Sequence, residues 1–134
     1  MLLGTDLRKA ASVLLPAYDD AAGVTAAFNK NVLTRINREL SGDFDLDRFR
    51  HVALWNESAS SVEMHLESTI AHDVFLAVPG VRVPFARGER IHTESSHKYD
   101  EARVERLFRR ADLARERTYF DDQRRFAVHL ARGG

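Results

Sequence analysis

The sequence predicts an α+β fold in which helices and antiparallel strands occupy separate stretches of the chain. An apolar repeat with a period of four precedes residue 41, an alternation with a period of two runs between residues 51 and 97, and a helical period returns after Tyr99. A period near 3.6 is typical of amphipathic helices, and a period of two is typical of half-buried strands. Because short turns separate the strands, we expect them to pair antiparallel.

Bulk composition narrows the class of protein. The chain has 134 residues, which fits one domain or a large piece of one. Its 20 basic and 20 acidic residues give a formal net charge of +0, which argues against nucleic acid or an anionic membrane as the main partner. Without cysteine, neither a disulfide nor a cysteine-based zinc site can form, and this fits a cytoplasmic protein without proving it. Neither a membrane span nor a secretion signal is expected.

The first 43 residues predict a strand end and two helical stretches. Leu2 and Leu3 indicate a buried strand that runs into a loop, and residues 7–16 indicate a short helical turn near Pro16. Residues 17–40 contain the clearest helix, which Gly42 is expected to end. The apolar stripe of this helix is expected to contain Val24, Phe28, Val32, Leu33, Ile36 and Leu40.

An antiparallel meander is predicted next, after a connector or short helix at residues 43–49. Its expected strands are residues 51–55, 61–67, 72–78, 81–90 and 90–96. Pro84 places one of them at an edge. A helix at residues 99–112 follows, with Val104, Leu107, Phe108 and Ala111 on its apolar stripe. Strands at 115–120 and 125–131, joined through residues 121–123, complete the expected elements.

Glu94 and Ser96 are the first candidates for a binding site. Two residues apart on a strand, they leave the same face, and His92 is expected there too. A carboxylate accepts a hydrogen bond from an N–H group, and a hydroxyl can donate to a second nitrogen or accept from it. This pair can therefore hold a small ring with two polar nitrogens. A solvated strand face is the alternative reading.

Tyr18 and Met64 also allow two readings each. The phenol of Tyr18 could reach a ligand carboxylate or pack at a helix entry, and Met64 could be core filler or a flexible wall for a substrate ring. Asp19 and Asp20 are expected to cap the helix.

The six histidines show no metal-ligand spacing, and the seven glycines form no glycine-rich loop, so no metal site, phosphate cradle or dinucleotide fingerprint is expected.

Five segments in a fixed order carry more specific information. They are LLGTDLRK, AYDDAAGVTAAFNKNVLTRINREL, DFDLDRF, VEMHL and IHTESSHKY. Together they resemble the C-terminal portion of the histidine-specific S-adenosylmethionine-dependent methyltransferases. The resemblance covers residues 2 to about 99 and is looser over residues 100–134. It implies an enzyme that trimethylates the α-amino group of L-histidine to give hercynine, the first step towards ergothioneine.

The resemblance also implies a division of the chain. Residues 1–8 would end a strand of a Rossmann-like methyltransferase sheet, residues 9–98 would form the substrate-binding domain, and residues 99–134 would add the last helix and hairpin of the sheet. The family's substrate-binding residues fall on Tyr18 for the carboxylate, on Glu94 and Ser96 for the imidazole, and on Met64 beside the ring, and Phe28 is expected to line the same pocket. No catalytic residue is assigned.

The family's main S-adenosylmethionine-binding half has no counterpart in these 134 residues. We therefore expect a truncated gene product, a mis-set start or a deliberate fragment, and expect the isolated chain to be inactive. Self-association, or pairing with a cofactor-binding half, is expected of its sheet edges. The two alternatives are a related N-methyltransferase acting on an indole amino acid and a non-catalytic remnant that serves as a binding or interaction module.

Overall fold

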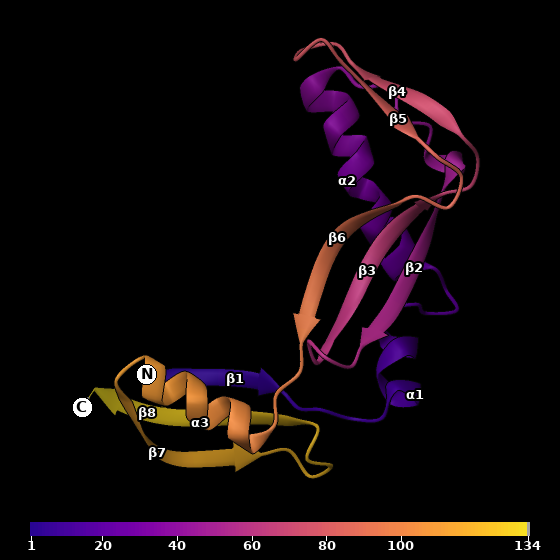
Figure 1. Cartoon of the computed structure of the whole chain (residues 1–134). Helices are drawn as coiled ribbons and strands as arrows, with labels where there is room; N and C mark the ends of the chain where they lie inside the picture. Colours follow the sequence, from indigo (N-terminus) through magenta and orange to yellow (C-terminus); the bar gives the residue numbers. More distant parts are fainter. Residues whose placement is uncertain (134) are drawn as a thin grey trace.

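The computed structural model describes residues 1–133 and confirms an α+β architecture with two groups of elements (Figure 1). The lower group in Figure 1 contains β1 (Leu2–Asp6), α3 (Glu101–Arg110), β7 (Leu113–Phe120) and β8 (Phe126–Gly133). The upper group contains α1 (Ala11–Leu14), η1 (Leu15–Ala17), α2 (Val24–Leu40), η2 (Leu46–Arg48), β2 (Phe49–Asn56), β3 (Ser61–Ser68), β4 (His72–Leu76), β5 (Val81–Phe85) and β6 (Arg90–His97). The chain enters the upper group after β1 and returns after β6.

The lower group is a three-stranded sheet covered by one helix. The strand order is β1-β8-β7, and β8 runs antiparallel to both neighbours. Val104 and Phe108 of α3 pack with Ala131 of β8 into a separate small core. Helix α3 is capped by Asp100, whose side chain accepts a hydrogen bond from the Arg103 backbone N–H at 2.7 Å. Leu107 is exposed, and Ala111 is exposed and lies just beyond the helix, so the predicted stripe is wrong at these two residues.

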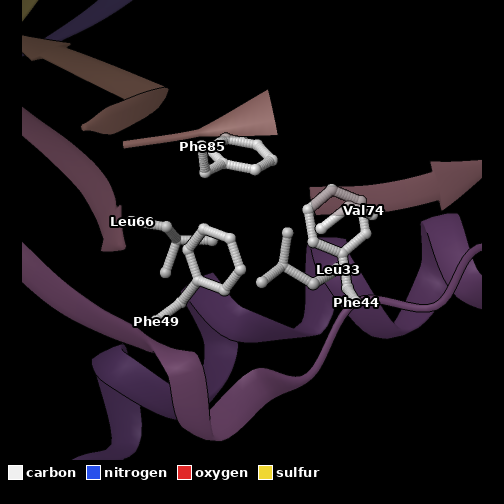
Figure 2. Packing of buried hydrophobic residues seen from close by; sticks show 6 residues of the cluster. All are labelled: Leu33, Phe44, Phe49, Leu66, Val74 and Phe85. Carbon is white, nitrogen blue, oxygen red and sulfur yellow. The ribbon is translucent and has the colours of Figure 1, made fainter. Parts of the chain in front are cut away.

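The upper group is not the simple meander that the period-two pattern predicts. β3 lies between β2 and β6, while β4 and β5 form a separate two-stranded sheet. This hairpin folds towards the end of α2, where Asp43 N–H donates to the Phe75 carbonyl at 3.1 Å. It closes a core in which Leu33 of α2 meets side chains from the surrounding strands and loops (Figure 2). The buried members of that core are Leu33, Phe44, Phe49, Leu66, Val74 and Phe85.

Helix α2 buries only part of the predicted stripe, since Leu33 and Ile36 contribute to the core while Val32 and Leu40 are exposed. Val24 and Phe28 are each 68% exposed, whereas Asn29 and Leu33 are buried and Ile36 packs against the core. A step of four residues advances about 40° around the helix beyond a full turn, so a stripe drawn at every fourth position drifts off one face. The start of α2 follows the prediction better. Asp20 accepts hydrogen bonds from the first backbone N–H groups, which lowers its pKa to about 2.

Ser41, and not Gly42, ends α2. Ser41 adopts the left-handed conformation with φ 48° and ψ 48°. Gly42 is needed for a different reason, since a Cβ atom there would lie 2.9 Å from both Asn37 Oδ1 and Leu76 Cδ2. The glycine therefore allows β4 to approach the end of the helix, and Gly42 and Leu76 form an isolated antiparallel bridge.

A short junction joins the two groups. Leu7 and Tyr99 form a parallel bridge, Tyr99 N–H donates to the Asp6 carbonyl at 2.9 Å, and Arg8 N–H donates to the Tyr99 carbonyl at 2.9 Å. The outgoing and returning segments thus lie side by side between β1 and the end of β6. Among residues 1–133, none of the helices has the length and apolar character needed to cross a membrane.

Candidate functional site

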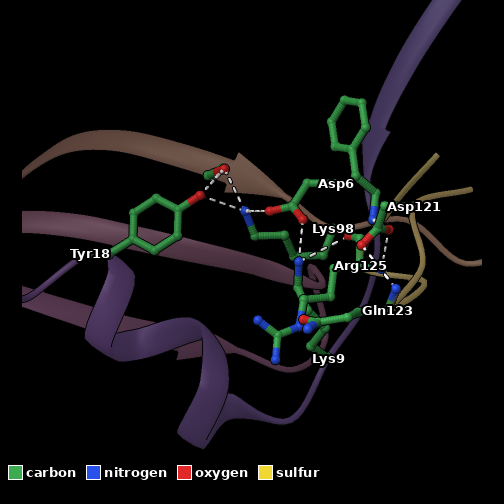
Figure 3. Close-up of polar contacts among 9 residues, drawn as sticks. Asp6, Lys9, Tyr18, Lys98, Asp121, Gln123 and Arg125 are labelled. Atoms are coloured by element: carbon green, nitrogen blue, oxygen red, sulfur yellow. Dashed lines mark hydrogen bonds and ion pairs between the residues drawn. The ribbon is translucent and has the colours of Figure 1, made fainter. Parts of the chain in front are cut away.

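A partly buried polar cluster occupies the junction between the two groups (Figure 3). Tyr18 follows η1, Ser96 lies near the end of β6, and Lys98 comes directly after that strand. The phenol oxygen of Tyr18 and Ser96 Oγ are 2.8 Å apart. Lys98 Nζ donates to the Tyr18 hydroxyl at 2.6 Å and to Ser96 Oγ at 2.8 Å. Two predicted site residues are therefore held together by a lysine that the sequence reasoning did not select.

Asp6 completes the surroundings of the Lys98 ammonium. Its Oδ2 lies 2.7 Å from Lys98 Nζ, and its other oxygen pairs with Lys9. The Lys98 side chain is 0% exposed, so its charge is balanced inside the protein. Burial alone would lower the pKa of Lys98, but hydrogen bonds to Asp6 and Tyr18 outweigh burial and raise it. Burial alone would raise the pKa of Asp6, but hydrogen bonds from Lys9 and Lys98 outweigh burial and lower it.

A second network fixes the backbone of Tyr18. His51 Nε2 lies 2.6 Å from the Tyr18 carbonyl, and His51 Nδ1 lies 2.9 Å from the amide nitrogen of Asn29. Because an amide nitrogen can only donate, Nδ1 accepts, and Nε2 carries the proton that it donates to Tyr18. Asn29 also donates to the His65 carbonyl at 3.2 Å. Helix α2 thereby positions Tyr18 through a side chain of β2.

Glu94 and Phe28 line a neighbouring hollow of about 270 Å³ between α2 and β6. The two residues are exposed, and Asn29 and Val32 also contribute to the wall. Met64 is buried and lies directly opposite Glu94 in the β3–β6 register. The structure therefore places Glu94 with Phe28 at this hollow and opposite Met64 in the strand pair, while Ser96, two residues further along β6, belongs to the cluster that contains Tyr18.

The strand face carries Glu94 and Ser96 as predicted, but His92 does not share it. Glu94 pairs with Met64 and Ser96 with Val62, so both face the side on which Met64 and Val62 are buried. A bulge then shifts the register, and Thr93 Oγ1 donates to the Met64 carbonyl at 2.8 Å. A bulge inserts one unpaired residue into the alternation.

Because of this bulge, His92 pairs with His65 on the other face of the sheet. The two imidazole rings are stacked with centroids 4.8 Å apart, and His65 Nε2 lies 3.4 Å from Glu63. The prediction for His92 is therefore wrong. Among residues 1–133, Glu63, His65 and His92 are the one group with the composition of a metal site, with ligand atoms within 4.8 Å of one another. A spacing test along the chain could not find this group, because it joins adjacent strands.

A larger hollow lies elsewhere, between α3 and the turn that joins β2 to β3, and measures about 940 Å³. It is rich in basic side chains, namely Arg8, Arg103, Arg106 and Arg110. None of the five predicted binding residues lines it. Size alone therefore does not identify the candidate site.

Lys98, Asp6, Asn29 and His51 are the site residues that sequence reasoning missed. Lys98 had a usable signal, because the period of two places residues 94, 96 and 98 on one side of the chain. Asp6 had none, since its contact with Lys98 spans 92 positions and depends on how the two groups of elements meet. Asn29 was not selected because the helix was read from its apolar residues alone, and Asn29 is polar.

Comparisons with known proteins agree on one family. A family model described as a histidine-specific methyltransferase, S-adenosylmethionine-dependent, matches residues 1–133. A histidine N-alpha-methyltransferase of Mycolicibacterium smegmatis is 47% identical over 131 residues, which are 98% of this chain and 41% of that relative. A histidine N-alpha-methyltransferase of Mycobacterium tuberculosis is 44% identical over 131 residues, again 98% of this chain and 41% of the relative. The chain thus spans about two fifths of the length of these relatives.

Proposed function

The chain belongs to the family of S-adenosylmethionine-dependent, histidine-specific methyltransferases, and from this premise we propose that it forms the histidine-binding portion of an N-methyltransferase. The proposed reaction transfers methyl groups from S-adenosylmethionine to the α-amino group of L-histidine. The proposed product is hercynine, and the proposed pathway is ergothioneine formation in the cytoplasm.

One observation carries the proposal. Glu94 and Ser96 leave the same face of β6, with Met64 and Phe28 beside Glu94 and Tyr18 hydrogen-bonded to Ser96. A carboxylate and a hydroxyl on one face can satisfy both ring nitrogens of an imidazole. A side chain without those nitrogens would leave the two polar groups unpaired, which is a strong basis for discrimination. An indole offers one N–H and no second nitrogen, so this pair favours histidine.

We also propose that the chain divides into a sheet portion and a substrate-binding portion. Residues 1–8 and 99–134 would belong to a Rossmann-like methyltransferase sheet, and residues 9–98 would bind the substrate. The order β1-β8-β7 supports this division, because β1 and β7 are both antiparallel to β8 and therefore parallel to each other, with α3 between them in sequence. A strand, a helix and a parallel strand form the repeating unit of such sheets.

The proposed role of this chain is to bind and orient the amino acid. S-adenosylmethionine supplies an activated methyl group when it is bound, so the protein mainly positions the two reactants. The sequence contains no glycine-rich loop to hold that molecule, and we assign no residue of this chain to it. Glu94, Ser96 and Tyr18 would hold histidine by its polar groups, with Met64 and Phe28 against its ring.

A hybrid enzyme tests the proposal. In it, this chain replaces the matching segment of the M. smegmatis relative, and methylation of L-histidine is followed by mass spectrometry. We expect the hybrid enzyme to methylate histidine, and we expect Glu94→Ala to raise the KM for histidine at least about tenfold, since losing a hydrogen bond to a charged group costs about 1.5–3 kcal/mol. The KM for S-adenosylmethionine should change little.

Glu116→Ala is the matched control, because Glu116 is an exposed glutamate of β7 far from the proposed site. It should leave both KM values unchanged. Folded hybrid enzyme that binds S-adenosylmethionine but methylates tryptophan better than histidine would favour the indole alternative. Equal and small effects of Glu94→Ala on both substrates would refute the assigned role of Glu94.

A further inference from the structure

Lys98 makes three contacts, and an ammonium group has three N–H donors. Its partners are Asp6 Oδ2 at 2.7 Å, the Tyr18 hydroxyl at 2.6 Å and Ser96 Oγ at 2.8 Å. The side chain is fully buried and has no donor left for a ligand. Its effect on a ligand must therefore pass through Tyr18 and Ser96.

The contacts of Lys98 determine what the two hydroxyl groups can do. A lysine ammonium only donates, so both hydroxyl oxygens accept from it and each keeps its own proton. Tyr18 and Ser96 also share a hydrogen bond of 2.8 Å, which uses one of those two protons. One hydroxyl proton remains, and it can only be donated to something outside the cluster.

The proton that remains for a ligand is the Ser96 hydroxyl proton when Tyr18 donates within the pair. The phenol is the more acidic of the two hydroxyls and therefore the better donor within the pair. If Tyr18 donates to Ser96, both lone pairs of Ser96 Oγ are occupied, one by Tyr18 and one by Lys98. Ser96 is then left as a donor alone, and Tyr18 acts on the ligand through Ser96 instead of donating to the carboxylate that the resemblance assigns to it. In the reverse arrangement Tyr18 offers the free proton, so the pair presents one donor in either case.

We infer that Lys98 is a positioning residue that makes the Tyr18–Ser96 pair a hydrogen-bond donor, so that the site takes the neutral and not the protonated imidazole ring. The inference deepens the proposed function and rests on it. A neutral imidazole has one N–H donor and one acceptor nitrogen, which match Glu94 as acceptor and Ser96 as donor. A protonated imidazole has two N–H donors, and one of them would face the donor of the pair and the buried Lys98 charge.

The test compares two ligands in the hybrid enzyme. L-histidine has a ring that is protonated below a pKa of about 6.5, whereas the ring of β-(1,2,4-triazol-3-yl)-L-alanine stays neutral throughout the range used. Dissociation constants for both are measured by calorimetry between about pH 5.5 and pH 8. The ionisable groups that face Lys98 or the ring, namely Asp6 with its partner Lys9, Tyr18 and Glu94, are the same for both ligands. The ratio of the two constants therefore reports the ring alone.

In the unmodified hybrid enzyme, the ratio of the histidine constant to the triazole constant should rise about tenfold per pH unit below the imidazole pKa. Lys98→Met should flatten this rise several-fold, because Ser96 regains a lone pair that can accept from a protonated ring. Lys98→Arg, which keeps the donors, should restore part of it. Tyr18→Phe preserves the packing and should also flatten the rise, which covers the case in which Lys98→Met does not fold.

A ratio that does not change with pH in the unmodified protein would overturn the inference while leaving histidine binding intact. A Lys98→Met or Tyr18→Phe variant with the full rise would overturn it too. If histidine does not bind at any pH, the proposed function fails.

In that event the cluster is still tested in the chain itself by NMR, because the chain has only the lysines Lys9, Lys30 and Lys98. The Lys98 ammonium protons should then exchange more slowly than those of Lys30 and lose this protection in Tyr18→Phe. Exchange as fast as that of Lys30 would refute the contacts on which the inference depends.

Discussion

Ser41 and Gly42 are neighbours with different structural roles: Ser41 adopts an unusual backbone conformation, and Gly42 allows close packing. Ser41 carries the left-handed conformation at the end of α2, which glycine adopts more easily than serine. Gly42 packs tightly against the side chains of Asn37 and Leu76, and a Cβ atom there would be 2.9 Å from each. Each residue therefore responds to substitution in its own direction.

We predict that Ser41→Gly raises the free energy of unfolding of the chain by about 0.5–1 kcal/mol, because the left-handed conformation disfavours a side chain. Gly42→Ala should lower it by about 1–3 kcal/mol, because one neighbour must move to admit the methyl group. Urea denaturation followed by circular dichroism measures both. Gly133→Ala is the control, since a Cβ atom there meets nothing within 4 Å, and it should have no effect. A destabilising Ser41→Gly would contradict this account.

Helix α2 links the upper core to the proposed site, and its two sides have different tasks. Leu33 lies in the core with Phe49 and Leu66, while Phe28 lines the hollow beside Glu94. Asn29, between these two sides, reaches His51 and so fixes the backbone of Tyr18. Val24, which is 68% exposed on the same helix, is consequently expected to contribute little to stability.

We predict that Leu33→Ala lowers the free energy of unfolding by about 2.5–5 kcal/mol, as expected for a large-to-small change in a packed core. Val24→Ala, on the same helix but 68% exposed, should change it by less than about 0.5 kcal/mol. Thermal and urea denaturation of the two variants against the parent chain provide the comparison. Similar losses for both would mean that the exposed stripe is covered in solution.

Local patterns predicted most of these elements, and the exceptions have physical causes. Periodicity located α2, α3 and the strands from β2 to β8, because side-chain direction repeats with the backbone. The strand expected at Leu2 and Leu3 is present as β1, but its predicted burial is wrong at Leu2, which is 69% exposed. It could not show that β4 and β5 leave the sheet, which depends on packing against the end of α2. It also could not show the bulge that turns His92 away, because a bulge is a property of two paired strands.

The predicted site residues divide in the same way. Glu94, Ser96 and Met64 follow from alternation along their own strands, and the structure places Glu94 opposite Met64. The ion pair between Lys98 and Asp6 arises only when β1 meets the end of β6. Contacts of this kind are set by the whole chain, so no single stretch of sequence indicates them. The roles of Tyr18, Phe28, Met64, Glu94 and Ser96 in binding stay predictions.

For the whole molecule, stability is expected to depend on pH through His129. This buried histidine bonds Thr5 of β1 through Nε2 at 2.9 Å and Thr118 of β7 through Nδ1 at 2.9 Å, so it connects all three strands of the lower sheet. Burial disfavours the charged ring and lowers the pKa of His129, and the nearby Arg115 lowers it further.

We predict that the chain loses stability as the pH falls below about 6.5. Between that value and the lowered pKa of His129, the unfolded chain binds a proton that the folded chain does not, so the free energy of unfolding decreases with falling pH. His129→Asn, which keeps hydrogen bonding but cannot be protonated in this range, should weaken the dependence. Urea denaturation at several pH values measures it, and an equally steep loss in His129→Asn would show that other groups cause it.

The adjacency of Leu7 and Tyr99 has a consequence for how such a protein can change over time. The intervening 91 positions leave and rejoin the lower sheet at neighbouring points, joined by the Arg8 to Tyr99 backbone hydrogen bond of 2.9 Å. Because the chain leaves and rejoins the lower sheet at neighbouring points, the backbone path of that sheet does not depend on the length of the segment between them. Substitutions, insertions and deletions within the proposed substrate-binding portion are therefore expected to leave the strand order of the lower sheet unchanged.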